Sequence, residues 1–410
     1  MMPVVRAPKR REEVLSVASS VMRTRGLLGT RLKDVARYLG VAHSALYHYF
    51  ESRDHMAQEV LVWNLDLRSE HLASAEGGSA LERLLDYISR DLEERRKQKV
   101  GIPSLVSLPE RYRRPVERAR GKFICELADL VAEGMVDGSI RRCDAKTIAH
   151  IIAHTVEAFV HVEKNSSARL RRSSGRTLAT HVVDLVRRGI ARGRRLTFEP
   201  SWSIADGGDL ILPDTSADEE VERLEQLKRT ATRHFNVRGS EASVSSIAEE
   251  LGVSKGAIYQ YTQDKRELMF QCLERAVSVI QRSNWLASHH GQDPLDEILI
   301  HRNNLFLYHA SDVGPFTNVS GIDYLKPHHQ RLIKMQNRAV RHISAQRVER
   351  GIAEGQLRRE IDPEFVQPIL WQALCGLPGW FDDDYPLSIK TVSREALTLH
   401  LQGLAEPASS

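Results

Sequence analysis

The feature that most constrains the fold is an eleven-residue phrase that occurs twice. The first copy, "GVAHSALYHYF", covers residues 40–50, and the second, "GVSKGAIYQYT", covers residues 252–262. Further landmarks follow in the same order, since "VAEGMVDGSIRRCDA" around Gly134 parallels "VERGIAEGQLRREIDP" around Gly351. A solenoid would repeat every 20–50 residues or so. The sequence therefore predicts a duplicated unit of roughly 200 residues.

Each copy of the unit is predicted to be helical. Apolar residues recur at intervals of three and four, which is the spacing of one helix face. The two corresponding stripes are Ile148, Ile151, Ile152, Thr155, Val156 and Phe159, and Val366, Ile369, Leu370, Ala373, Leu374 and Leu377. No run of alternating β-branched residues accompanies them. We therefore expect an all-α protein.

A stretch rich in Pro, Gly, Ser and Asp separates the two copies, which is the composition of a linker. The resulting domain prediction is residues 1–64 for a first helix–turn–helix head, 65–199 for a first helical region, 200–217 for the linker, 218–275 for a second head and 276–410 for a second helical region.

Composition excludes several classes of protein. The 410 residues are 41% hydrophobic with a net charge of +4, which is ordinary for a globular protein of two or three domains. The four cysteines lie far apart with no metal-ligand spacing, and adjacent histidine pairs lack the partners that a zinc site requires. No stretch has the length of a membrane span or a signal peptide. We expect a cytoplasmic protein with no metal, no cofactor and no membrane partner.

The repeated phrase sits inside a helix–turn–helix pattern. Leu32, Val35, Ala36 and Leu39 are expected on the inner face of a short first helix. Gly40 suits the positive φ of a tight turn, and residues 43–50 form the second helix. In the other copy, Ser254 is expected to cap the second helix. Such an arrangement allows the second helix to enter the major groove of DNA.

The two motifs, "VARYLGVAHSALYHYFESRDHM" and "IAEELGVSKGAIYQYTQDKREL", resemble those of the tetracycline-repressor (TetR) family of bacterial regulators. The resemblance extends to the later stretch that contains Gly134 and Gly351. It implies that three N-terminal helices bind a double-stranded DNA operator. It also implies a larger helical region that holds a small-molecule effector and forms a dimer interface through its last two helices. An effector would then change the spacing of the heads and release the operator.

The resemblance also implies which residues face DNA. His43, His48 and Gln260 are the candidates for reading bases. The candidates for contacting phosphates are Tyr47, Tyr259, Arg53 and Lys265. The full set is Thr30, Arg31, His43, Ser44, Tyr47, His48 and Arg53 in the first head, and Ser243, Lys255, Gly256, Tyr259, Gln260 and Lys265 in the second.

The two heads differ in charge and in motif quality. Residues 1–60 carry ten Lys and Arg against six Asp and Glu, whereas residues 218–275 carry nine against eleven. Cations drive DNA binding through counterion release, so the first head is expected to bind more strongly. Ala42 stands where the family has a capping Ser or Thr, and Thr262 stands where it has an aromatic residue.

Aromatic residues are denser in the second helical region, and aromatic side chains commonly line apolar ligand pockets. The candidates for an effector site are Phe306, Tyr308, Phe316, Trp371, Trp380 and Phe381. The same residues could instead form the core. No catalytic motif is present, so we expect no enzymatic activity.

The resulting hypothesis is an effector-released repressor in which one chain carries both partners of a dimer. Two different reading helices predict an operator with two unlike half-sites. One alternative is a homodimer of whole chains with four heads. Another is a small-molecule-binding helical protein, or an activator, in which the second head no longer binds DNA.

Overall fold

The computed structural model describes residues 11–406 except for residues 26–29, 99–107, 166–177, 194–198, 205–218, 239–241, 312–313, 315–321, 323, 378–379 and 382–383. It divides into two compact units: unit 1 comprises residues 1–187 and 404–410, and unit 2 comprises residues 188–403. The described residues form helices joined by turns, and their only extended pairings are two isolated antiparallel bridges. The predicted all-α fold is confirmed. Most of the expected linker, residues 205–217, lies outside the described residues.

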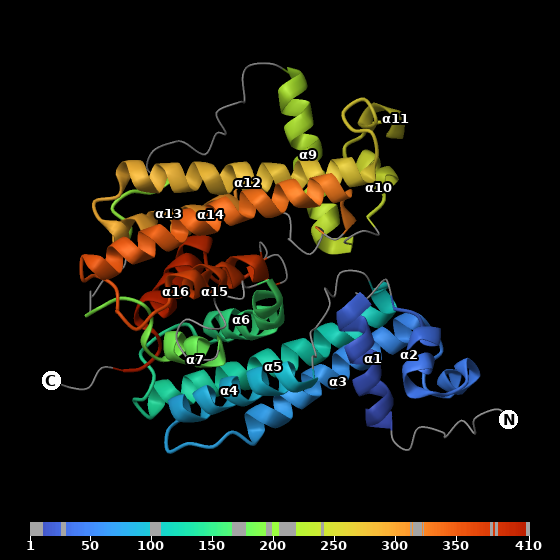
Figure 1. The fold of residues 1–410 in the computed structure, drawn as a ribbon, viewed down its shortest axis with the longest axis horizontal. Helices are drawn as coiled ribbons and strands as arrows, with labels where there is room; N and C mark the ends of the chain where they lie inside the picture. The colour runs from blue at the N-terminus through green and yellow to red at the C-terminus, as the bar shows by residue number, and fades with distance from the viewer. Residues whose placement is uncertain are drawn as a thin grey trace. The chain divides into compact units, whose positions relative to one another are not determined.

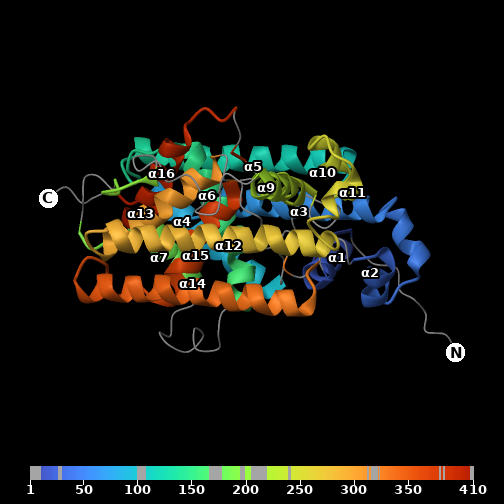
Figure 2. The ribbon, with the colours of Figure 1, turned by 90° about the horizontal axis from the view of Figure 1, so that it is seen from above.

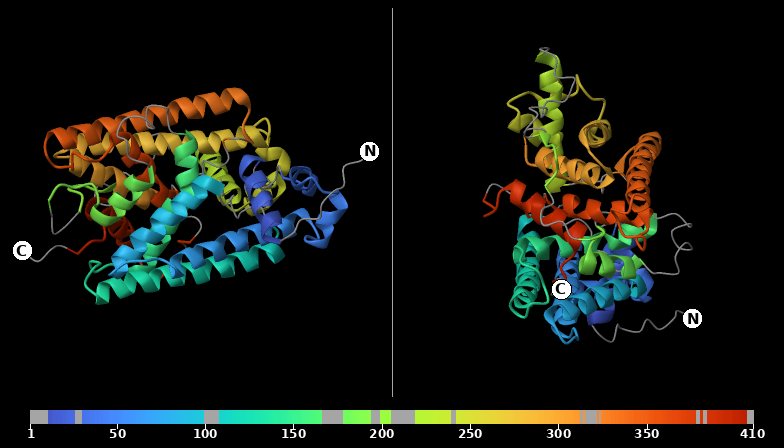
Figure 3. Two further views of the ribbon diagram at one scale, coloured as in Figure 1. Left: turned by 60° about the horizontal axis from the view of Figure 1, so that its bottom comes forward. Right: turned by 90° about the vertical axis from the view of Figure 1, so that its left-hand side faces the viewer.

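The helices of unit 1 follow the predicted order of a small head and a larger helical region (Figure 1). They are α1 (Arg11–Arg25), α2 (Leu32–Leu39), the 3-10 helix η1 (His43–His48), α3 (Arg53–Ala73), α4 (Ala80–Gln98), α5 (Glu110–Val136), α6 (Ala145–Asn165) and α7 (Leu178–Arg188). The long helices α3 and α5 run side by side, in blue and teal in Figure 3.

Unit 2 repeats this order of elements. Its helices are α9 (Glu219–Arg238), α10 (Val244–Glu250), α11 (Lys255–Ile258), α12 (Lys265–His290), α13 (Pro294–His309), α14 (Pro327–Ala353), α15 (Pro363–Gly376) and α16 (Ile389–Gln402). The long helices α12 and α14 lie next to each other (Figures 1 and 2). The duplication seen in the sequence is therefore a duplication of structure.

The two apolar stripes lie in the cores of their units. In α6 the four aliphatic residues Ile148, Ile151, Ile152 and Val156 are at most 1% exposed. In α15 and the turn after it, Val366, Ile369, Leu370, Leu374 and Leu377 are buried. Burial of one such side chain contributes about 1.5–3 kcal/mol, so these faces account for the packing of both helices.

Gly134 and Gly351 occupy corresponding positions, and each allows an aliphatic side chain to lie close to the helix backbone. A Cβ on Gly134 would lie 2.5 Å from Cδ1 of Ile140, and a Cβ on Gly351 would lie 2.8 Å from Cδ1 of Leu357. Only glycine leaves room for these aliphatic side chains against the helix. The two copies therefore share this turn because of packing.

Each unit also contains a segment from the other end of the chain. In unit 1 the backbone amides of Leu404 and Ala405 donate to the carbonyl oxygens of Val186 and Arg187, at 2.8 and 3.0 Å. An antiparallel bridge joins Ala405 to Ile140. The C-terminal residues of the second copy are thus part of the unit that the first copy builds.

Unit 2 contains the equivalent pairing. The amides of Ile190 and Ala191 donate to the carbonyl oxygens of His400 and Leu401, at 3.0 and 2.9 Å, and a bridge joins Ala191 to Leu357. Each residue in the first set of hydrogen bonds has a counterpart in the second set at a distance of 214 residues in the sequence. The counterparts are Leu404 and Ile190, Ala405 and Ala191, His400 and Val186, and Leu401 and Arg187. The residues after α7 and after α16 therefore occupy corresponding places in opposite units.

Several buried histidines predict acid sensitivity. Burial lowers the pKa of His150, His154 and His400 to about 3, and that of His309 to about 4. In the unfolded chain a histidine takes up a proton near pH 6.5, so unfolding binds extra protons below that pH. Stability is present above pH 6.5 and decreases as the pH falls toward 4. Urea unfolding followed by circular dichroism at pH 7.5, 6.0 and 5.0 should give a decreasing midpoint. A midpoint that is unchanged at pH 5.0 would contradict this account of the buried histidines.

Candidate DNA interface

The first head presents its reading segment on a turn that glycine makes possible. Gly40 has φ 67°, as expected for the tight turn, and the amide of Val41 donates to the carbonyl of Ala36 at 3.1 Å. Leu46 and Phe50 are both 0% exposed and hold η1 against the head. The residues on the outer side of η1 are all exposed: His43, Ser44, Tyr47 and His48.

The reading segment is a 3-10 helix, whereas the sequence predicted an ordinary second helix. Ala42 occupies the N-cap position and has no side-chain oxygen to accept from the first turn. The backbone instead closes with a tighter i to i+3 hydrogen bond, in which the amide of Ala45 donates to Ala42 O at 3.0 Å. The capped segment of the second head has the equivalent hydrogen bond, from the amide of Ala257 to Ser254 O at 3.0 Å, so the missing cap alone does not account for this geometry. The His43 and Tyr47 rings lie 5.1 Å apart on the outer side of η1.

The residues predicted to contact the DNA backbone differ in how far they reach the surface. Thr30 is fully buried, so its side chain is not at the surface of the head. Arg31 is exposed and precedes α2, where its amide donates to Oδ2 of Asp34 at 3.2 Å. Arg53 is half-buried and pairs with Asp54 at 2.8 Å. The DNA contacts of these three residues stay predictions.

In the second head the capping prediction is confirmed. Gly252 has φ 67°, and the Ser254 hydroxyl accepts from the amide of Ala257 at 3.2 Å. The outward side chains of this segment are exposed, as in the first head. They are Lys255, Tyr259 and Gln260, with Gly256 beside them, while Ser243 caps the preceding helix α10.

The small core behind the second reading segment has lost an aromatic residue. Thr262 is 5% exposed and donates its hydroxyl proton to the carbonyl of Asp264 at 3.0 Å. The corresponding position in the first head is Phe50, which is fully buried. A threonine buries less apolar area than a phenylalanine, so this part of the second head gains less from burial.

In unit 1, the start of α5 attaches to the helix that follows the reading segment. The N-cap hydroxyl of Ser52 donates to the phenol oxygen of Tyr112 at 3.2 Å. The rings of His55 and Tyr112 stack with centroids 6.2 Å apart. The helical region therefore contacts the head one turn after the reading segment.

The corresponding attachment in unit 2 is ionic. Lys326 lies 3.0 Å from the carboxylate of Asp264, which is the N-cap of α12, and His329 stacks on Phe270 at 3.8 Å. The pKa of Asp264 is lowered by the hydrogen bond from the backbone of Glu267 and by Lys326. Lys265 lies over the ring of Tyr324 at 5.5 Å, so this expected phosphate contact also has an intramolecular partner.

The aromatic residues proposed for an effector site fall into separate groups. Phe306 and Tyr308 on α13 are at most 2% exposed. Trp380 and Phe381 are half-buried and form a cluster with Tyr385, with ring centroids 5.1–6.3 Å apart. Trp371 on α15 is half-buried, and Phe316 lies outside the described residues. Their role in effector binding stays a prediction.

A buried ionic network in unit 1 was not predicted from the sequence. The Arg68 side chain is 1% exposed and its guanidinium donates to Glu157 at 2.7 Å and to the phenol oxygen of Tyr87 at 3.2 Å. Asp91 lies 3.6 Å away, and the guanidinium covers the ring of Phe123 at 4.2 Å. The sequence signal that could have indicated this network is the position of Arg68, which shares one face of α3 with the buried apolar residues.

The described residues contain neither a cluster of metal ligands nor a membrane-spanning helix. No group of three or more His, Cys, Asp or Glu among them could hold a metal ion. Among the same residues, no helix combines the length and the apolar character needed to cross a membrane.

Comparison with known proteins identifies both heads. The family described as "Bacterial regulatory proteins, tetR family" matches residues 14–60 and again residues 228–272. A second family, "Tetracyclin repressor-like, C-terminal domain", matches residues 303–404. The two matches to the first family cover both copies of the helix–turn–helix motif.

Curated relatives agree with these matches, and a solved structure aligns with part of this chain. The HTH-type transcriptional repressor KstR2 of Mycolicibacterium smegmatis is 31% identical over 144 residues, which are 32% of this chain and 68% of that protein. KstR2 of Rhodococcus jostii is 39% identical over 57 residues, 14% of this chain and 28% of the relative. The structure of the ketosteroid transcriptional regulator KstR2 of Mycobacterium tuberculosis aligns at 20% identity and a TM-score of 0.40, over 45% of this chain and 96% of that one.

The described architecture agrees with these similarities. Each unit begins with a helix–turn–helix head that exposes its reading segment and continues into a larger helical region. Together with the similarity over two thirds of a repressor, the two family matches show that this chain belongs to the TetR family of DNA-binding transcriptional regulators, which are not enzymes.

Proposed function

We propose that this regulator is an effector-released repressor in which one chain supplies both partners of a dimer and binds one operator with two unlike half-sites. The observation that carries the proposal is the exchange of chain ends. Residues 404–406 form hydrogen bonds inside unit 1, and residues 190–192 form the equivalent hydrogen bonds inside unit 2. Each unit is completed by chain from the other copy, which supports intramolecular pairing of the two copies.

Unlike half-sites are supported by the exposed residues of the two reading segments. The tyrosines Tyr47 and Tyr259 are common to both heads, and they are 54% and 44% exposed. The neighbouring exposed positions differ, with His48 in the first head where Gln260 stands in the second. Glutamine reads adenine through a bidentate contact. Two heads with different side chains at this position should therefore prefer different bases.

Release by an effector is supported by the attachments at the start of α5 and α14. The Ser52–Tyr112 hydrogen bond and the Lys326–Asp264 ion pair both join the helical region to the helix that follows a reading segment. A change in the helical region could therefore move the heads. The effector remains a small molecule of unassigned class, and the aromatic residues of the second helical region remain its candidate contacts.

The half-site proposal predicts that each head controls its own half of the operator. We expect His48→Ala to weaken binding by about 1–3 kcal/mol and to relax base preference in one half-site only. Gln260→Ala should relax the other half. Selection of bound genomic fragments with each variant, followed by footprinting, measures both effects. The control is Val136→Ala, which alters a side chain that is 89% exposed at the end of α5.

The outcomes separate the proposal from its alternatives. Relaxation of the same positions by both variants, or a near-perfect palindrome contacted equally by both heads, would contradict unlike half-sites. If Gln260→Ala changes no position of the operator, the second head does not bind DNA. The net negative charge of residues 218–275 and the buried Thr262 favour that alternative.

A further inference from the structure

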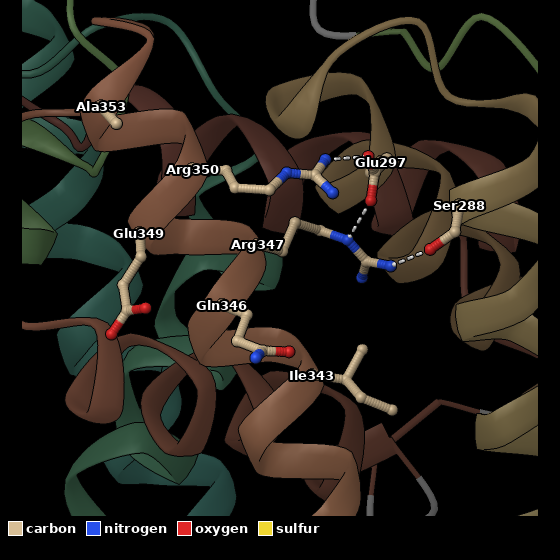
Figure 4. Close-up of a pocket in the computed structure, with 8 residues that line it drawn as sticks. All are labelled: Ser288, Glu297, Ile343, Gln346, Arg347, Glu349, Arg350 and Ala353. Atoms are coloured by element: carbon tan, nitrogen blue, oxygen red, sulfur yellow. Dashed lines mark hydrogen bonds and ion pairs between the residues drawn. The ribbon is translucent and has the colours of Figure 1, made fainter.

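An open hollow of about 650 Å³ lies in unit 2, lined by residues of α12, α13 and α14 (Figure 4). Two arginines of α14 border it. The Arg347 side chain is 3% exposed, whereas the Arg350 side chain is 52% exposed. Pockets of roughly 300–1,000 Å³ are large enough for small molecules. The hollow therefore has the size of a ligand site, with one guanidinium buried beside it and another within reach of solvent.

Two arginines and two glutamates line this hollow, and both arginines pair with the same glutamate, Glu297. The buried Arg347 donates from Nε to Oε2 of Glu297 at 2.8 Å and from Nη2 to the hydroxyl of Ser288 at 3.1 Å. Arg350 also pairs with Glu297. Figure 4 shows both guanidinium groups directed at this single carboxylate, with Glu349 extending away from them. Two cations thus share one anion.

The corresponding corner of unit 1 shows what the fold itself requires. There the two charges are exchanged between the helices. In unit 1 the arginine is Arg83 on α4 and the glutamate is Glu133 on α5. In unit 2 the glutamate is Glu297 on α13 and the arginine is Arg350 on α14. Each unit therefore has one ion pair of this kind between the two corresponding helices. The second arginine of unit 2 has no counterpart in this arrangement.

Arg347 also contacts Asn284, and the positions that correspond to these two residues are apolar in unit 1. Leu130 stands where unit 2 has Arg347, and Leu72 stands where it has Asn284, and both leucines are less than 10% exposed. In unit 2 these positions are joined by a hydrogen bond from Arg347 Nη1 to Asn284 Oδ1 at 3.0 Å. Replacing a buried ionic group with packed apolar residues is often neutral or stabilising. The same fold is built without Arg347, so its retention calls for a reason other than packing.

We propose that the hollow binds a small molecule that carries an oxyanion, either a phosphate or a carboxylate group. The exposed guanidinium of Arg350 is the principal contact, because the planar fork of arginine matches both groups. Arg347 holds Ser288 and Glu297 in place beneath it. Ile343, which is 42% exposed, lies at the rim and contacts an apolar part of the ligand. This site does not depend on the DNA-binding proposal.

The test uses three probes with the same six-carbon chain: hexyl phosphate, hexanoate and hexan-1-ol. Calorimetric titration of the full chain measures binding directly and requires no DNA. Arg350→Gln removes the exposed cation. The double variant Arg347→Leu with Asn284→Leu carries the residues of unit 1, so its fold has a precedent within the same chain. Arg331→Gln makes the same change of charge at another exposed position of α14.

At least one of the two anions is expected to bind once per chain, and the alcohol should bind at least tenfold more weakly. Arg350→Gln and the double variant should each weaken anion binding tenfold or more, while Arg331→Gln leaves it within twofold. The preferred anion then identifies the group as phosphate or carboxylate. No anion binding, equal binding of the alcohol, or equal weakening by Arg331→Gln would overturn the proposal.

Discussion

Replacing Gly189 with alanine is expected to lower the free energy of unfolding of unit 2 by about 3 kcal/mol or more. Gly189 has φ 63°, a conformation that costs an L-residue about 1 kcal/mol. A Cβ there would also lie 2.2 Å from the carbonyl carbon of Leu401 and 2.3 Å from its oxygen. These are backbone atoms of the helix that receives the hydrogen bonds of Ile190 and Ala191. The substitution should therefore break the pairing of the exchanged segment.

A matched control lies four residues further along the chain. Gly193 has φ 76°, and a Cβ there meets nothing within 4 Å. Gly193→Ala should therefore cost only the conformational term, about 1 kcal/mol. Urea unfolding of both variants, followed by circular dichroism, measures the difference. Equal losses of stability would show that the close approach at Gly189 does not hold the exchanged segment.

Replacing Arg68 with isoleucine is expected to destabilise unit 1 by about 3–5 kcal/mol. The substitution copies Ile280, the residue at the corresponding position of α12 in unit 2. In unit 1, however, it removes the guanidinium that lies 2.7 and 3.6 Å from the carboxylates of Glu157 and Asp91. Glu157 then keeps Arg120 at 3.7 Å, and Asp91 keeps His71 at 3.3 Å. Removing the main cationic partner of a buried carboxylate costs more than the pair itself contributes.

The control removes an exposed arginine of the same unit. Arg11 is 59% exposed and pairs with Glu59, and exposed pairs contribute only about 0–1 kcal/mol. Arg11→Ile should therefore change the urea midpoint little. Combining Arg68→Ile with Glu157→Leu should recover part of the loss because one of the two carboxylates that lost the guanidinium is removed. If Arg68→Ile and Arg11→Ile cost the same, the network does not stabilise unit 1.

Local sequence signals predicted the features of the fold that depend on local chemistry. The duplicated phrase indicated two copies of one helical unit, Gly40 was expected to take a positive φ, and Ser254 was expected to cap its helix. These features follow from the backbone freedom of glycine and the hydroxyl of serine. The 3-10 geometry of η1 was not predicted.

Features that depend on distant parts of the chain could not be predicted. The hydrogen bonds of Leu404 and Ala405 join backbone atoms more than 200 residues apart and carry no side-chain pattern. The partners of Arg68 come from α4 and α6, so the sequence shows the arginine but not the carboxylates beside it. For the candidate interface, the motif indicated the exposed reading residues, but it did not indicate that Thr30 is buried.

Native mass spectrometry of the protein with a selected operator tests the central claim most directly. If one chain supplies both partners of a dimer, the smallest specific complex contains one chain and one operator that holds both half-sites. The free protein should likewise be a single chain of 46.4 kDa. A complex that contains two chains at every concentration, with two copies of the same half-site, would contradict intramolecular pairing.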